Sequence, residues 1–254
     1  KVELTETASL FENLDNIGEK HHVSVPEGME YFGQNFGLIY YETTLKGKYN
    51  ASPMYVKNVH DFAEVYFDGE KKTSIDRTLY SVEGKTTLKD VIFKKKKGES
   101  SPFLMPALSG ERKIGVLVDT MGRINYGGNM LDRKGISDIY LGIQRLMNYD
   151  VWTLPLDNLD KLKYSSSVKK DEPVFLRGSF KTDSKADCFI HLDGFNRGCV
   201  YINGFNLGRF WKVGPQKSLY IPGTLLKDEN EIIVFNIGGY SKPTVSITDK
   251  HNLG

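Results

Sequence analysis

Cysteine, tryptophan and long apolar runs are scarce in this sequence. Its 254 residues include 2 cysteines and 2 tryptophans. The two thiols, Cys188 and Cys199, are too few for a disulfide framework or a four-ligand zinc site. A hairpin could bring them face to face, but adjacent strands rarely suit the bond, so we expect two buried thiols. No apolar stretch approaches the roughly 20 residues needed to span a bilayer.

An excess of either charge is also absent. Lysine and arginine total 34 against 32 aspartates and glutamates, which leaves a formal net charge of +2. This balance predicts neither a nucleic-acid partner nor a membrane partner. The basic block Lys94–Lys97 lacks interleaved aromatic residues and is followed by Gly98 and Glu99, which favours a solvated loop over a phosphate-binding track.

The first residues carry no signal-peptide pattern. The chain starts at Lys1 rather than at an initiator methionine, so the sequence looks like an excised or processed segment. A bacterial cytoplasmic location and a secreted or periplasmic one therefore both stay open.

The motifs of several catalytic chemistries are missing. There is no Gly-x-Ser-x-Gly elbow and no glycine-rich phosphate loop followed by lysine. No pair of histidines has the spacing of metal ligands, so we expect neither a metal nor a cofactor. The five histidines are His21, His22, His60, His191 and His251.

Sugar hydrolysis normally needs two carboxylates that face one bond. Spacing alone pairs none of the acids in this chain. The string Glu229-Asn230-Glu231 stands directly before the apolar run Ile232–Phe235, where polar residues usually form the preceding turn. We therefore expect a turn at this string rather than a catalytic pair.

The dominant periodicity is two, which is typical of β-strands because successive side chains point to opposite faces. Apolar and polar residues alternate in this way over several segments, and 14 tyrosines and 14 phenylalanines suit a pleated surface. The clearest segments are 38–43, 63–67, 189–192 and 232–235. The sequence contains no long amphipathic helix, so it predicts an all-β fold.

Two hairpin turns reveal an internal repeat. Asp68-Gly69 and Asn203-Gly204 each follow an apolar run and supply the positive φ angles of a tight turn. At the same offset, Ile39-Tyr40-Tyr41 falls on Val174-Phe175-Leu176. The segment Ile114–Val118 resembles Glu231–Phe235 at a shorter offset, so we expect an insertion in the first copy.

Each copy has the size of one jelly-roll sandwich of about 100 residues. The boundary lies near residues 150–170, where Leu154–Asn158 is irregular and Ser165–Ser167 is polar. We expect a lead-in strand and connection over residues 1–30. The first sandwich would then cover residues 31–150, and the second, a jelly roll, residues 151–254.

Two motifs resemble the C-terminal, galactose-binding-like jelly-roll region of glycoside hydrolase family 35 β-galactosidases. The first is Gly198–Trp211, continued by Gly214-Pro215-Gln216 and Leu219–Pro222; the second is Met121–Gly127, followed by Asp132 and Lys134–Ile136. Four positions depart from the family's pattern, and the resemblance spans essentially the whole chain. Arg197 stands for a lysine, Tyr201 for a tryptophan, Phe210 for a tyrosine and Thr120 for an asparagine.

The resemblance implies that the catalytic glutamates lie on an N-terminal (β/α)8 barrel. This chain has no alternation of strands and helices that would form such a barrel. The string Glu229-Asn230-Glu231 copies a barrel motif in letters only, because its context is a jelly-roll strand. We therefore expect no catalytic residue here. The chain would be a non-catalytic accessory region of a retaining β-galactosidase that hydrolyses terminal β-galactosides, with the barrel of the same polypeptide as its partner.

The resemblance also implies that the loop around Tyr126 reaches the mouth of the barrel and helps to line the galactose site. A tyrosine suits this role because its ring stacks on a sugar while its hydroxyl forms hydrogen bonds. We expect Arg123 and Asn125 to hold the loop in shape. Arg209 and Trp211 lie just past a tight turn, where a guanidinium can stack on an indole, and we favour interdomain packing over sugar contact for them.

Two other functions stay open. One is an independent carbohydrate-binding module that recognises galactose-containing glycans. Such modules display exposed aromatic residues, whereas Trp152 and Trp211 stand in segments that look packed, which favours the accessory region. The other is a purely structural or dimerising domain, which the sequence does not exclude.

Overall fold

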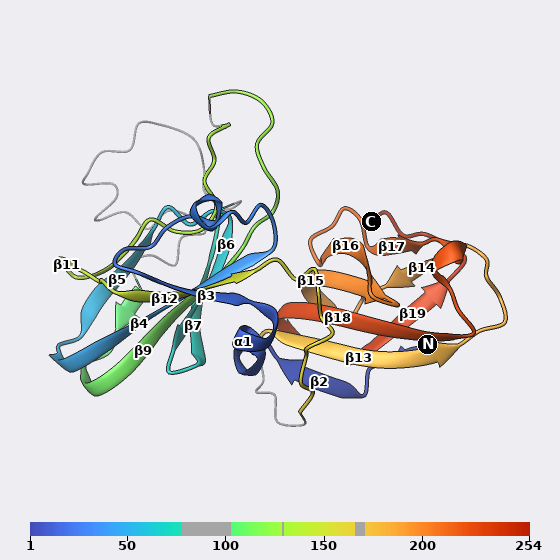
Figure 1. The fold of residues 1–254 in the computed structure, drawn as a ribbon, viewed down its shortest axis with the longest axis horizontal. Coiled ribbons are helices and arrows are strands. Elements are labelled where there is room, and N and C mark those ends of the chain that lie inside the picture. The colour runs from blue at the N-terminus through green and yellow to red at the C-terminus, as the bar shows by residue number, and fades with distance from the viewer. Residues whose placement is uncertain (78–102, 129, 166–170) are drawn as a thin grey trace. The chain divides into compact units, whose positions relative to one another are not determined.

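The computed structural model describes residues 1–77, 103–128, 130–165 and 171–254. The basic block Lys94–Lys97 and residues 166–170 lie outside this part. Antiparallel sheets dominate, and the chain divides into two compact units (Figure 1). Residues 18–156 form the first sandwich, and residues 1–17 together with 157–254 form the second sandwich. The expected all-β fold with two tandem β-sandwiches is confirmed.

In the described residues, the first sandwich consists of a six-stranded and a four-stranded sheet. The larger sheet has the order β3-β12-β4-β9-β6-β7 and the smaller one β11-β10-β5-β8. The bounds are β3 Glu19–Val23, η2 Met29–Phe32, β4 Leu38–Tyr49, β5 Ser52–Lys57, β6 Phe62–Phe67, β7 Glu70–Asp76, β8 Phe103–Met105, β9 Leu108–Asp119, β10 Asp138–Leu141, β11 Gln144–Arg145 and β12 Tyr149–Leu154.

Alternation along the strands builds the core of the first sandwich. Ala63, Val65 and Phe67 of β6 point inward, as the period of two predicts, and they join a cluster to which both sheets contribute. Met54 on β5 and Ile139 on β10 reach that cluster from the smaller sheet. Each fully buried valine, isoleucine, methionine or phenylalanine side chain contributes about 1.5–3 kcal/mol to the free energy of folding.

The second sandwich pairs a five-stranded sheet, in the order β16-β15-β18-β13-β2, with a four-stranded sheet, in the order β1-β19-β14-β17. Its core holds Leu176, Val200 and Val234 from the larger sheet and Ile190 and Leu219 from the smaller one. The bounds are β1 Val2–Glu3, β2 Glu6–Ser9, η1 Phe11–Asn13, α1 Leu14–Ile17, β13 Val174–Lys181, β14 Cys188–His191, β15 Phe195–Ile202, β16 Phe205–Trp211, β17 Ser218–Ile221, η4 Gly223–Leu225, β18 Glu229–Tyr240 and β19 Thr244–Thr248.

The internal repeat is present in the strand order. The run β7-β6-β9-β4 of the first sandwich matches β16-β15-β18-β13 of the second. Both hairpins carry an irregularity at the same place, between Val65 and Tyr66 and between Val200 and Tyr201. These two sites are 135 positions apart (200 − 65), the offset of the two turns.

The expected alignment of β9 in the first copy of the repeat with β18 in the second is wrong by one residue. The expected match of Ile114 with Glu231 implies an offset of 117 (231 − 114), whereas the pairs Val65–Val116 and Val200–Val234 give 118 (234 − 116). A slip of one residue would exchange the two faces of a strand. At the correct offset Ile114 corresponds to Ile232, and both are fully buried.

The N-terminal segment belongs to the second sandwich, unlike the expected bounds. β2 pairs with β13 and β1 pairs with β19, so residues 1–17 extend both sheets of that unit. Residues 18–30 fall in the first sandwich, and the division on the C-terminal side comes after Leu156 rather than after residue 150. The short segment Glu6–Ser9 has too few residues to reveal its partner strand from its own pattern.

The cysteines do not share a hairpin. Cys188 lies on β14 of the four-stranded sheet, whereas Cys199 lies on β15 of the five-stranded sheet. Neither forms a disulfide, and both side chains are half-buried rather than fully buried. Among the residues that the structure describes, no helix is long and apolar enough to cross a membrane.

Candidate functional site

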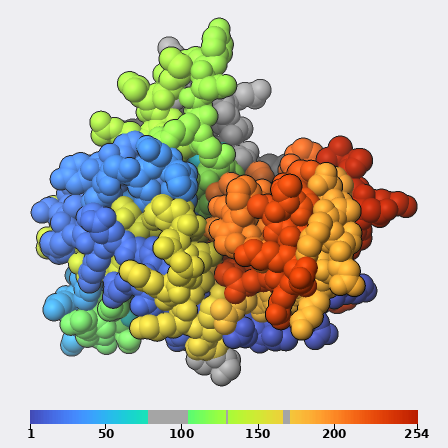
Figure 2. All heavy atoms as spheres, turned by 45° about the vertical axis from the view of Figure 1, so that its right-hand side comes forward, coloured from blue at the N-terminus to red at the C-terminus, as the bar shows by residue number. Residues whose placement is uncertain are grey.

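The loop between β9 and β10 is the main candidate site. Residues 120–137 connect these strands and contain the motif around Tyr126. The described part of this loop projects from the first sandwich (Figure 1), and its green atoms stand clear of the neighbouring surface in Figure 2. Such a loop needs anchors at its base if its tip is to hold a defined position.

The tip of the loop exposes apolar side chains. Tyr126 is 89% exposed, Met130 61% and Leu131 97%. Soluble proteins rarely gather large apolar side chains on one exposed segment unless it meets another surface. The tip is therefore suited to contact with a ligand or with another protein surface.

Asp61 ties the two ends of the loop together. Its Oδ2 accepts a hydrogen bond from the backbone N–H of Met121 at 2.8 Å and another from Nζ of Lys134 at 2.8 Å. Its Oδ1 accepts one from Arg77 at 2.9 Å. Asp61 stands directly before β6, so the six-stranded sheet fixes its position.

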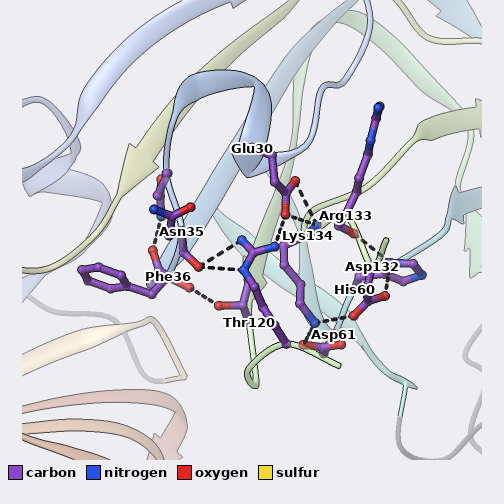
Figure 3. Close-up of polar contacts among 12 residues, drawn as sticks. Glu30, Asn35, Phe36, His60, Asp61, Thr120, Asp132, Arg133 and Lys134 are labelled. Atoms are coloured by element: carbon purple, nitrogen blue, oxygen red, sulfur yellow. Dashed lines mark hydrogen bonds and ion pairs between the residues drawn. The ribbon is translucent and has the colours of Figure 1, made fainter. Parts of the chain in front are cut away.

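Lys134 and Asp132 form a buried charged pair at the end of the loop. Their side chains are 2% and 3% exposed, and Nζ lies 2.7 Å from Oδ2 of Asp132 (Figure 3). Arg77 adds a further ion pair to Asp132 at 2.7 Å. Two carboxylates, Asp61 and Asp132, thus face two cations, so the cluster balances its charge, as buried ionic groups require.

The pKa of Asp132 shows which effect dominates in this cluster. Burial alone would raise the pKa of this carboxyl group, but hydrogen bonds from Lys134 and Arg77 outweigh burial and hold the pKa below its usual value. The carboxylate is therefore charged at neutral pH. Charged Asp132 keeps Lys134 in place and closes the loop.

Glu30 provides a second clamp from η2. One of its oxygens pairs with Arg123 near the start of the loop, and both oxygens accept the backbone N–H of Lys134 at 3.0 and 3.2 Å. Arg123 also donates from Nε and Nη2 to the backbone carbonyl of Asn35, at 3.2 and 3.0 Å. Arg123 thus joins the loop to the preceding segment, which is the kind of contact expected of a residue that holds the loop in shape.

The described tip of the loop is exposed, unlike the clamped base. Asn125 and Tyr126 are both exposed, and neither is part of the clamps. The hydrogen-bonded base thus supports a tip on which the Tyr126 side chain is open to contact.

Arg197, which had no expected role at Trp211, lies over its ring, and the expected interdomain role of Arg209 and Trp211 stays a prediction. The guanidinium of Arg197 lies 4.9 Å from the centroid of the Trp211 ring, since the two residues face each other across β15 and β16. Arg209 is exposed on β16, and Trp211 is half-buried. Arg197 is buried, so its stack with Trp211 belongs to the packing of the second sandwich.

Within residues 1–77, 103–128, 130–165 and 171–254, no three His, Cys, Asp or Glu side chains come together in a way that could hold an ion.

Family comparison agrees with this architecture. The family model described as "Beta-galactosidase, first all-beta domain" matches residues 26–97 and 86–156, which cover more than half of the chain. The chain belongs to the β-galactosidase family. A second family model, "Beta-galactosidase, galactose-binding domain", matches residues 173–231 of this family member. Both matches are to accessory all-β domains of the family.

Curated β-galactosidases are similar along most of the chain. "Beta-galactosidase" of Xanthomonas manihotis is 34% identical over 220 residues, covering 86% of this chain and 33% of its own length. "Beta-galactosidase-1-like protein 2" of Homo sapiens is 33% identical, covering 97% and 37%, and "Beta-galactosidase 8" of Oryza sativa subsp. japonica is 30% identical, covering 93% and 40%. The chain thus spans between a third and two fifths of the length of these relatives.

Apart from Arg123, the clamp residues of the loop were not assigned a role from the sequence. Asp132 and Lys134 stood within the matched motif, but Glu30, Asp61 and Arg77 are distant from it in the chain. One signal could have pointed to Asp61, because a carboxylate directly before the apolar strand Phe62–Phe67 needs a partner if it is buried. Nothing in the sequence identifies that partner as Lys134.

Proposed function

We propose that this chain is the non-catalytic accessory region of a retaining β-galactosidase of glycoside hydrolase family 35, which hydrolyses terminal β-galactosides. The catalytic carboxylates would then lie on a barrel outside this chain. The family matches to all-β domains support this proposal. So does the length of the relatives, of which the chain covers 33–40%.

The observation that carries the proposal is the contrast between the base and the tip of the 120–137 loop. Four charged side chains lock the base, whereas Tyr126 is 89% exposed. An aromatic side chain on a fixed support can stack on a sugar without losing much conformational freedom on binding. We assign Tyr126 to the galactoside site of the intact enzyme, with Arg123 as a positioning residue.

A kinetic comparison in the longer protein, with its catalytic barrel present, tests this role. Tyr126→Ala should raise KM for a galactoside about tenfold, which corresponds to the loss of one stacking contact and one hydrogen bond. Tyr126→Phe should recover part of that loss because the ring remains. Tyr31→Ala is a matched control, since Tyr31 is also exposed (68%) and belongs to η2 of the same sandwich.

Three outcomes separate the possibilities. A raised KM for Tyr126→Ala with an unchanged Tyr31→Ala supports the role. Unchanged kinetics for both variants would contradict it. Equal losses in both would also contradict it, because they would point to the general surface of the sandwich rather than to the loop.

A further inference from the structure

A pocket of about 500 Å³ lies on the second sandwich, far from the loop in sequence. Its volume falls within the range of small-molecule sites. Strands β13, β15 and β18 and the segment 157–164 supply its walls. The polar and aromatic residues that line it include Asp157, Asp160, Tyr164, Arg177, Tyr201 and Glu231.

The strands turn their outer faces toward this pocket. Leu176, Val200 and Ile232 belong to the core of the second sandwich. Their neighbours Arg177, Tyr201 and Glu231 therefore point to the opposite face, because side chains alternate along a strand. The pocket is thus floored by the five-stranded sheet, a rigid support for polar groups.

Arg177 is fixed in the wall by contacts with three residues. Its Nε and Nη2 donate to the two oxygens of Glu6, each at 2.8 Å, and its guanidinium carbon lies 3.8 Å from the centroid of the Tyr164 ring. Its Nη1 lies 3.6 Å from Glu231. A guanidinium held in this way needs no reorganisation when a ligand arrives.

The backbone of Glu231 is also held in place. Its N–H donates to Oδ1 of Asn203 at 2.9 Å, and the Asn203 amide donates to the carbonyl of Leu225 at 2.8 Å. The Glu231 side chain is 44% exposed. Asp157 and Asp160 are exposed, and within the described part of the chain neither carboxylate forms a hydrogen bond or an ion pair.

The hydroxyl of Tyr164 is buried without a hydrogen-bond partner among the residues that the structure describes. Burial raises the pKa of Tyr164 to about 12, so this group keeps its proton and remains a donor. A buried hydroxyl without a partner costs free energy that a bound oxygen or water would restore.

The mixture of donors and acceptors selects a ligand class. Three carboxylates disfavour an anion. The Arg177 guanidinium in the wall disfavours a compact cation, and in the described segments no set of side chains could hold a metal ion. A ligand with many hydroxyl groups, which donate to carboxylates and accept from Tyr164 and Arg177, fits all of these groups. We propose that this pocket binds a neutral saccharide.

This site is separate from the proposed role of Tyr126. It needs no catalytic barrel, and it belongs to the unit whose family model carries the description "galactose-binding domain". Failure of one proposal therefore leaves the other standing.

The test is an NMR titration of the 254-residue chain with galactose, lactose and glucose. Saturable shifts should appear in residues of β13, β15 and β18 that border the pocket, for at least one of these sugars. Asp160→Asn and Glu231→Gln should each weaken binding about tenfold or more, the usual effect of losing a hydrogen bond to a charged group. Dispersed amide spectra of both variants would show that they fold.

A control variant distinguishes this pocket from another one on the same sandwich. Asp193 is exposed and lines a smaller cavity of about 230 Å³ beside Trp211. Asp193→Asn should therefore leave the affinity unchanged. The proposal is overturned if no sugar binds, if Asp193→Asn alone abolishes binding, or if the pocket responds only to calcium or a polyamine.

Discussion

Nζ of Lys134 lies 2.8 Å from Oδ2 of Asp61, a residue 73 positions earlier in the chain. The two side chains are 2% and 7% exposed, so water screens this ion pair only weakly. The pair connects the end of the long 120–137 loop to the start of a central strand. We conclude that the loop base is part of the sandwich rather than a loose connection.

Removing the charge of Asp61 should destabilise the first sandwich. Asp61→Asn leaves Lys134 with one fewer carboxylate, and breaking a buried pair in this way typically costs about 3–5 kcal/mol. Urea unfolding measures this change. Glu111→Gln is the control, because its pair with Lys46 is 63% and 75% exposed and should contribute at most about 1 kcal/mol. Equal effects of the two substitutions would contradict the buried clamp.

Acid should release the same clamp. The pKa of Asp132 is held below its usual value, so this group binds more protons in the unfolded chain than in the native one at acidic pH. Its contribution to stability is therefore complete above the unfolded pKa of about 3.9 and is lost as the pH falls through the lower native pKa. Comparing urea unfolding near neutral pH and at acidic pH, for the chain and for Asp132→Asn, measures this. An acid dependence that Asp132→Asn leaves unchanged would rule out the linkage.

Two glycines with similar backbone angles should respond differently to alanine. Gly135 has φ +118° and Gly47 has φ +113°, in the region that disfavours other residues, so both alanine variants should lose about 1 kcal/mol. A Cβ at Gly135 would also overlap the hydroxyl of Tyr41, which donates to the carbonyl of Glu27. At Gly47, no neighbouring atom of the described residues would lie within 4 Å of such a Cβ. Thermal unfolding should show a clearly larger loss for Gly135→Ala. Equal losses would show that the Tyr41 contact is dispensable.

The fold could be predicted from the sequence because its signals are local. Alternation identified the strands, and the dipeptides Asp68-Gly69 and Asn203-Gly204 marked the two equivalent hairpins. The alignment of β9 in the first copy of the repeat with β18 in the second was missed by one residue. Both segments carry apolar residues at adjacent positions, so the sequence fits either alignment. The pairing of Glu6–Ser9 with β13 was missed because a four-residue strand carries no information about a partner 165 or more positions away.

The candidate site was predicted less completely. The motif around Tyr126 was visible, but the charges that hold its loop come from distant segments, such as Glu30, Asp61 and Arg77. The contact of Arg197 with Trp211 was not foreseen, because it depends on the pairing that places the two residues opposite each other on β15 and β16. Contacts across strands depend on register, which single residues do not reveal.

The central proposal is that the catalytic carboxylates lie on a barrel outside this chain. Assaying the purified 254-residue chain with an aryl β-galactoside tests it most directly. We predict no turnover above the uncatalysed rate, while the longer protein with its barrel hydrolyses the same substrate. Turnover that copurifies with the chain and disappears on substitution of one of its own carboxylates, for example in Glu231→Gln, would contradict the account.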